Sequence, residues 1–258
     1  GLKASGVTAV SLANNHAEDC GDSAMLETLD LTAKANLFSA GVAREADPFK
    51  PTRWDIRNGV VALFSATTKR NRGSPFPDAK AQLAFKPFKE MGRFLPEIIQ
   101  SYRKAHPNEL ILVSLHWGSE RAVRPYPGQR RLAHRLIDAG ANAVVGHHPH
   151  VLQPVEAYRG GLILYSTGNL VFDMRAPETR ATALFDMAFT RDEQGQYRAT
   201  GLVIHPLQIS PSDGRPESLE ERKQFMTMLK QQSRRTAKTL LKWRGPRLVW
   251  TPEKTAHQ

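Results

Sequence analysis

The stretch GQRRLAHRLIDAGANAVVGHHPHV, residues 128–151, decides the fold class that we predict. Its first half places Leu132 and Leu136 on one helical face and ends at Gly140, a residue typical of a helix C-terminus. The apolar run that follows indicates a buried strand, and residues 109–120, ELILVSLHWGSE, indicate another strand before it. A strand, helix and strand of this length suit a crossover between parallel strands, so we predict an α/β fold.

The rest of the chain continues this pattern. Apolar and amphipathic periodicities predict strands at residues 7–12, 59–67 and 161–173, helices at residues 22–41 and 88–105, and an antiparallel hairpin over residues 183–210. Glycine, prolines and basic residues predict a mobile loop over residues 69–80, KRNRGSPFPDAK. From Glu217 onward we expect a charged helix, followed by a basic tail that ends at Gln258.

Composition narrows the class of protein. The chain has 258 residues and a formal net charge of +11, which favours association with polyanions without deciding among nucleic acid, acidic polymers and anionic membranes. A single cysteine, Cys20, excludes an intramolecular disulfide. No apolar run approaches the roughly 20 residues of a membrane span, and no signal peptide is visible.

Polar side chains gather where four predicted strands end. The strand ends are VSLANNH, LVSLHWG, AVVGHHPH and LILYSTGN, which begin at residues 10, 112, 143 and 162. Ligands of open α/β sheets collect beyond the carboxyl ends of strands. We therefore expect these segments to line one site, to which they would bring Asn15, His16, His116, His147, His148, His150 and Asn169.

These residue types favour metal chemistry. Neutral imidazoles and an amide oxygen suit a first-row divalent metal, and Pro149 between His148 and His150 allows both rings to project into one pocket or toward two metals. Two metals about 3.5 to 4 Å apart would support hydrolysis of a phosphoryl group without a protein nucleophile. Taken singly, each histidine is more often a structural residue, so the prediction depends on their convergence.

Other chemistries fit the sequence less well. Ser166 lacks the glycines of a nucleophile elbow, and Cys20 follows two acids that disfavour a thiolate. No Walker loop or dinucleotide-binding glycine pattern is present. The basic stretch KRNR, residues 69–72, is interpreted as a solvated loop, and nucleic acid is not expected as a partner.

The same stretches resemble a known family. SLANNHAEDCG, LHWGSE, AGANAVVGHHPHVLQPVEAYRG and ILYSTGNLVFD are similar to motifs of the bacterial capsule-synthesis CapA family, which is associated with poly-gamma-glutamate and is a branch of the calcineurin-like metallophosphoesterase superfamily. The resemblance covers residues 1–175 and implies a two-sheet sandwich flanked by helices, α/β/β/α. It also implies truncation at the N-terminus, because the superfamily's first strands and their acidic ligands would precede Gly1. We expect such a domain over residues 1–210 and a charged helical extension with a basic tail over residues 211–258.

The resemblance also assigns roles to the site residues. It implies metal ligation by Asn15, His116, His148 and His150, with a dinuclear centre of manganese, zinc, iron or magnesium in the full-length protein. It also implies contact of His16 with the substrate phosphate, so that Asn15 and His16 are the catalytic candidates. Asp19 and Glu120 would orient ligands from a second layer, while His147 and Asn169 would border the pocket.

Two functions remain open at this point. The first is a metal-dependent hydrolase of the metallophosphoesterase type that acts on a phosphoester or an anionic polymer. The second is a non-catalytic accessory subunit that binds an acidic chain beside a membrane synthase. In either case the resemblance implies the cell envelope, on the extracytoplasmic face of the membrane.

Overall fold

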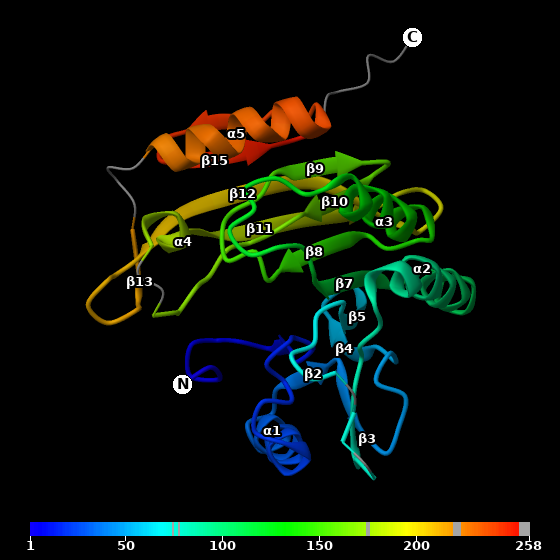
Figure 1. Cartoon of the computed structure of the whole chain (residues 1–258). Coiled ribbons are helices and arrows are strands. Elements are labelled where there is room, and N and C mark those ends of the chain that lie inside the picture. The colour runs from blue at the N-terminus through cyan, green and yellow to red at the C-terminus, as the bar shows by residue number, and fades with distance from the viewer. Residues whose placement is uncertain (74, 77, 174–175, 219–222, 253–258) are drawn as a thin grey trace. The chain divides into compact units, whose positions relative to one another are not determined.

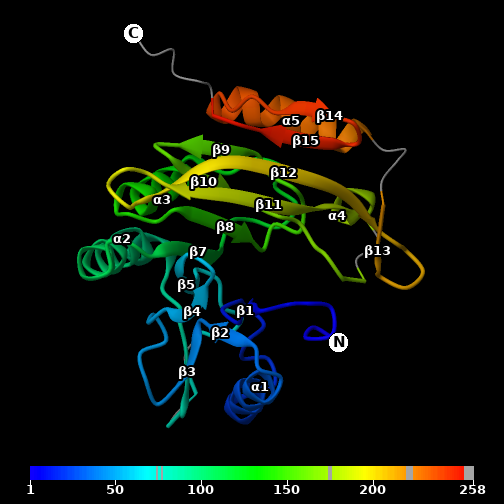
Figure 2. The same cartoon turned by 180° about the vertical axis from the view of Figure 1, so that it is seen from behind.

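The chain folds into two compact units. The computed structural model describes residues 1–73, 75–76, 78–173, 176–218 and 223–252. The first unit comprises residues 1–117 and 139–141, and the second comprises residues 118–138 and the chain from residue 142 onward. Helices lie beside strands in each unit, as Figure 1 and Figure 2 show from opposite sides. This mixed α/β architecture, with multi-strand sheets flanked by helices, confirms the predicted fold class.

Strand β5 (Gly59–Thr67) is the centre of the first unit. It pairs antiparallel with β4 (Thr52–Ile56) and parallel with β7 (Leu110–His116). Helix α2 (Phe88–Ala105) lies between β5 and β7 in the chain, as a parallel pair requires, and buries Leu95 and Ile99 among other residues. Strand β5 and helix α2 have the predicted bounds. Two smaller pairs complete the unit: parallel β1 (Ala9–Ser11) and β2 (Phe38–Ala40), and antiparallel β3 (Val42–Arg44) and β6 (Ala81–Leu83).

The predicted helix over residues 22–41 is too long. Helix α1 is Asp22–Lys34, and Asn36 then adopts a positive φ of 51° that turns the chain into strand β2. Parallel pairing with β1 outweighs the helical pattern of the last residues. Gly41 is therefore not a helix stop. A Cβ there would lie 2.5 Å from Ser65 Oγ and 2.6 Å from Ala13 Cβ, so the glycine allows a close approach of two segments.

A partly buried carboxylate ties β7 to its neighbours. Glu109 accepts hydrogen bonds from the Arg53 guanidinium and from Tyr102 Oη, the latter at 2.7 Å. Burial raises the pKa of Glu109, but the hydrogen bonds from Arg53 and Tyr102 outweigh it and hold this pKa below its usual range. Glu109 is therefore ionised in the folded protein at neutral pH.

The second unit contains two sheets. In one, β10 (Gly161–Leu164) pairs parallel with β8 (Ala143–His147) and antiparallel with β9 (Val155–Tyr158), and helix α3 (Pro127–Asp138) lies beside β8. In the other, the long strands β11 (Ala181–Arg191) and β12 (Tyr197–Ile209) form the predicted hairpin, which follows the short helix α4 (Pro177–Arg180). The predicted strand at residues 161–173 ends early, because the chain leaves the sheet after Leu164.

The C-terminal region contains more sheet than predicted. Strand β12 also pairs with β13 (Pro216–Ser218) and with β15 (Arg247–Trp250), which forms a hairpin with β14 (Lys242–Arg244). The basic tail prediction is therefore wrong over residues 242–250, because Leu248 is fully buried opposite Ile204 of β12. The last predicted tail residues, 253–258, lie outside the described residues, and the domain boundary after residue 210 stays a prediction.

Helix α5 (Lys223–Ala237) covers strand β9, which stands at the edge of its sheet. The backbone N–H of Val155 donates to Ser233 Oγ at 3.0 Å, and that of Ala157 donates to Thr239 Oγ1 at 3.0 Å. Two side-chain hydroxyls at and just beyond the helix end therefore satisfy alternate donors of this strand.

Candidate metal centre

Asn15 and His116 meet in the first unit. Asn15 follows β1, His116 is the last residue of β7, and His116 Nε2 donates to Asn15 Oδ1 at 2.8 Å. Both residues are buried. Two ligands bound to one metal at about 2.1 Å each lie roughly 3 Å apart, so this separation suits a shared divalent ion. The structure thus brings together two of the predicted metal ligands from sequence positions 101 residues apart.

His16 is oriented by Asp19. His16 Nδ1 donates to Asp19 Oδ2 at 2.6 Å, and Asn71 Nδ2 donates to Asp19 Oδ1 at 3.0 Å. The hydrogen bonds from His16 and then Asn71 lower the pKa of Asp19, so its carboxylate is ionised at neutral pH. With Nδ1 engaged, Nε2 is the ring nitrogen of His16 that is left to contact a substrate.

The loop of residues 69–72 belongs to this group, which the sequence did not indicate. Asn15 Nδ2 donates to Asn71 Oδ1 at 2.9 Å, and the Arg70 guanidinium forms a two-bond ion pair with Glu18. The side chains of Arg70 and Glu18 are only 10% and 5% exposed. The interpretation of KRNR as a solvated loop is therefore wrong for Arg70, since a buried carboxylate holds it against the Asn15 motif.

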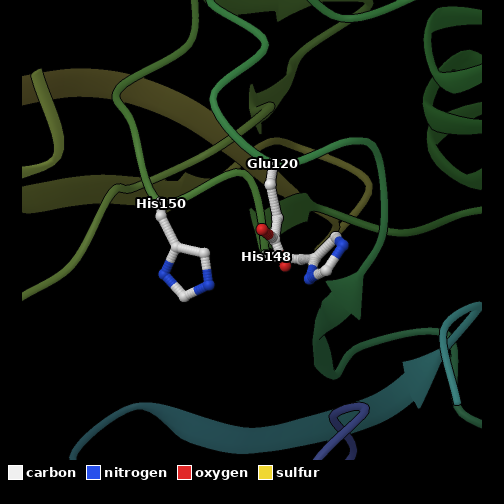
Figure 3. A group of neighbouring side chains, drawn as sticks. All are labelled: Glu120, His148 and His150. Atoms are coloured by element: carbon white, nitrogen blue, oxygen red, sulfur yellow. The ribbon is translucent and has the colours of Figure 1, made fainter. Parts of the chain in front are cut away.

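Glu120, His148 and His150 form a second group, in the second unit. One ligand atom from each residue lies within 4.8 Å of the others, and Figure 3 shows the Glu120 carboxylate beside the two rings. Two imidazoles and one carboxylate are a ligand set typical of zinc and other first-row divalent metals. Glu120, predicted to act from a second layer, therefore stands with the candidate ligands themselves and would supply a negative charge.

The backbone places these side chains at a conformational cost. His148 and His150 have positive φ values of 99° and 59°, which are unfavourable for residues with a Cβ and occur often at functional sites. The N–H of Arg121 donates to the Pro149 carbonyl at 2.8 Å, which ties the Glu120 turn to the histidine loop. Gly118 has a φ of 90°, and a Cβ there would lie 2.8 Å from Gln129 Nε2.

Asn169 orients His150. His150 Nδ1 donates to Asn169 Oδ1 at 2.7 Å, and Asn169 Nδ2 donates to the Thr179 carbonyl at 3.1 Å. A hydrogen bond at one ring nitrogen fixes the tautomer that leaves the other free for a metal. Asn169 therefore holds a candidate ligand rather than only bordering the pocket. Burial and the neighbouring His148 lower the pKa of His147 to about 4, so that ring is neutral at physiological pH.

Each group lies within one unit of the chain. The structure brings Asn15 together with His116 and Asn71, and it brings His148 and His150 together with Glu120 and Asn169. A single centre that uses both groups stays a prediction, as do the roles of the individual residues. Among the described residues, no helix has both the length and the apolar character needed to cross a membrane.

The fold and these groups agree with a capsule-synthesis domain. Residues 1–174 match the family described as Bacterial capsule synthesis protein PGA_cap, and the chain belongs to this family. The match contains both candidate ligand groups.

Curated relatives support the same assignment. The chain is 35% identical over 223 residues to PGA biosynthesis protein CapA of Bacillus subtilis, which covers 86% of the chain and 57% of the relative. It is 34% identical over 186 residues to Capsule biosynthesis protein CapA of Bacillus anthracis, with 71% and 44% covered. A Mycobacterium tuberculosis relative named "Probable polyglutamine synthesis accessory protein" is 32% identical over 176 residues, with 63% and 44% covered. The chain thus spans about half the length of these relatives.

Proposed function

We propose that this chain is a metal-dependent hydrolase of the metallophosphoesterase type that acts in the synthesis of an anionic capsule polymer. The observation that carries the proposal is the cluster of Glu120, His148 and His150, in which Asn169 fixes the orientation of one ring. Asn15 and His116 would supply further ligands. The polymer context comes from the relatives, whose names refer to capsule and PGA biosynthesis.

In this proposal, hydrolysis requires residues that hold the metal and a residue that stabilises charge on the substrate. A divalent metal, when bound, supplies Lewis-acid polarisation of a phosphoryl oxygen and activates water. Asn15, His116, Glu120, His148 and His150 would hold that metal or a pair of metals.

His16 would stabilise charge that develops on the substrate. Because the Asp19 carboxylate can only accept hydrogen bonds, Nδ1 of His16 carries a proton, and Nε2 donates to a phosphate oxygen when the ring is protonated. Asp19, which in turn accepts a hydrogen bond from Asn71, keeps the ring in position for this contact.

Metal content tests the proposal directly. The chain would be loaded with Zn²⁺ or Mn²⁺, desalted and measured by elemental analysis, together with hydrolysis of bis-p-nitrophenyl phosphate. We expect His148→Ala/His150→Ala to lose metal and activity. His205→Ala is the matched control, because it removes an imidazole that contacts the Asp186 carboxylate at 2.7 Å in the same unit. Equal metal content in all three proteins would overturn the proposal.

A second candidate function is a non-catalytic accessory subunit that binds the acidic polymer. It is favoured by the net charge of +11 and by the name of the mycobacterial relative, an accessory protein of polyglutamine synthesis. Metal binding without hydrolysis, together with polymer binding that survives His148→Ala/His150→Ala, would favour it. Under either function we propose a place at the cell envelope, on the outer face of the membrane beside a polymer synthase.

A further inference from the structure

A basic cavity lies in the second unit where the end of helix α5 meets strand β9 and the β14–β15 hairpin. Its volume is about 570 Å³. Figure 2 shows α5, β14 and β15 side by side. Three cations line the cavity, Lys238, Lys242 and Arg244, together with Trp250 and with no acidic residue among its described lining. This cavity contains none of the candidate metal ligands.

The hairpin register explains why the cations share one face. Lys242 stands opposite Val249 and Arg244 opposite Arg247, and residues that face each other across a strand pair project to the same side. The alternate pair, Trp243 and Leu248, projects to the other side, where Leu248 is fully buried. The hairpin therefore packs its apolar side into the unit and presents its basic side to the cavity.

The third cation is fixed by the end of the helix. Lys238 directly follows α5 with a φ of 54°, and its N–H donates to the Arg234 carbonyl at 3.0 Å. The next residue, Thr239, is buried and accepts the N–H of Ala157. Lys238 therefore leaves a backbone that is held on both sides, in the left-handed geometry common at helix C-termini.

Among the residues that the structure describes, no acid forms an ion pair with these three cations. Alternate residues of one strand lie about 6.6 Å apart along its axis, which is similar to the spacing of alternate carboxylates on an extended acidic polypeptide. A chain of carboxylates could thus contact Lys242 and Arg244 in succession and then reach Lys238.

We propose that this cavity binds a segment of an acidic polypeptide through Lys238, Lys242 and Arg244. The choice of a polycarboxylate rests on the proposed function in capsule polymer synthesis. The three cations lie outside residues 1–174, which match the family, and they would hold the polymer independently of metal.

Polymer binding tests this inference. Fluorescence anisotropy would measure the affinity of the chain for labelled poly-glutamate across a range of salt concentrations. We expect Lys242→Glu/Arg244→Glu to weaken binding by about tenfold or more and to reduce its salt dependence. Arg131→Glu/Arg135→Glu is the control, since it changes the net charge equally at two exposed positions on α3 of the same unit. The neutral pair Lys242→Gln/Arg244→Gln should show a smaller loss and serves if charge reversal unfolds the protein.

The outcomes separate this inference from the proposed function. Equal loss in the hairpin and α3 variants would mean attraction to overall charge, and unchanged affinity in both hairpin variants would mean that the cavity is not the site; either result overturns the inference. Tighter binding of a single-stranded oligonucleotide than of poly-glutamate at the cavity would overturn the ligand class. Metal content and phosphodiester hydrolysis should be unchanged in the hairpin variants, so failure of the metal proposal would be seen separately.

Discussion

Removal of the Asn169 amide should weaken metal binding without removing any ligand. In Asn169→Ala, the His150 Nδ1–H loses the acceptor that it contacts at 2.7 Å. Loss of a partner that orients a metal-binding histidine typically costs about 10- to 100-fold in affinity, or roughly 1.4 to 2.7 kcal/mol. We therefore expect Zn²⁺ affinity to fall by about 10- to 100-fold.

Asn169→Asp separates the contact with His150 from the contact with the Thr179 carbonyl. Both variants lose the amide that donates to the Thr179 carbonyl, but aspartate still accepts from His150. Zn²⁺ affinity, measured by competition with a chromogenic chelator, should therefore be low in the alanine variant and native or higher in the aspartate variant. Asn142→Ala controls for the loss of a buried asparagine, because Asn142 donates to the Tyr197 carbonyl in the same unit. Native affinity in Asn169→Ala would refute the reasoning.

Three further predictions concern stability. Gly118→Ala should lower the free energy of unfolding by about 1 to 2 kcal/mol in urea titrations, because its φ is 90° and the added Cβ meets Gln129; a native midpoint would contradict this. The pKa of Glu109 is lowered in the folded protein, so this carboxylate stabilises the fold fully above its ordinary pKa of 4.5 and contributes less as the pH falls below that value. Glu109→Gln should therefore be less stable than the native protein at pH 7, and its melting temperature should fall less than the native one on acidification. Arg70→Ala should destabilise the protein by about 3 kcal/mol through the unpaired carboxylate of Glu18, and Arg70→Met/Glu18→Leu should recover part of that loss if burial of the pair is the cause.

The sequence predicts elements well where one pattern dominates. Helix α2 and strand β5 have strong periodicities of their own, and both were predicted with the observed bounds. Strand β4 was missed because TRWDI is largely polar and becomes a strand only by pairing with β5. The β14–β15 hairpin was missed for a similar reason, since its fully buried Leu248 stands among basic residues and leaves no clear apolar alternation.

The candidate site shows the same limit. The strand-end argument predicted that Asn15 and His116 would approach each other, and the structure brings them into contact. Asn71 was not predicted, because its contact with Asn15 joins a loop to a motif 56 residues away and leaves no local pattern. The position of Glu120 among the ligands likewise depends on the positive φ of Gly118 and on the hydrogen bond from the Arg121 N–H to the Pro149 carbonyl, which join two separate segments.

The hydroxyl contacts between helix α5 and strand β9 have a consequence for aggregation. An open strand edge offers a row of N–H groups to any other extended chain and is a common start of sheet-to-sheet association. In this protein the hydroxyls of Ser233 and Thr239 accept two of the N–H groups on β9, so α5 and the residues just after it block pairing at that edge. A shortened protein that kept only the family-matching residues 1–174 would lose both hydroxyls, and its β9 edge would be open to pairing with another copy.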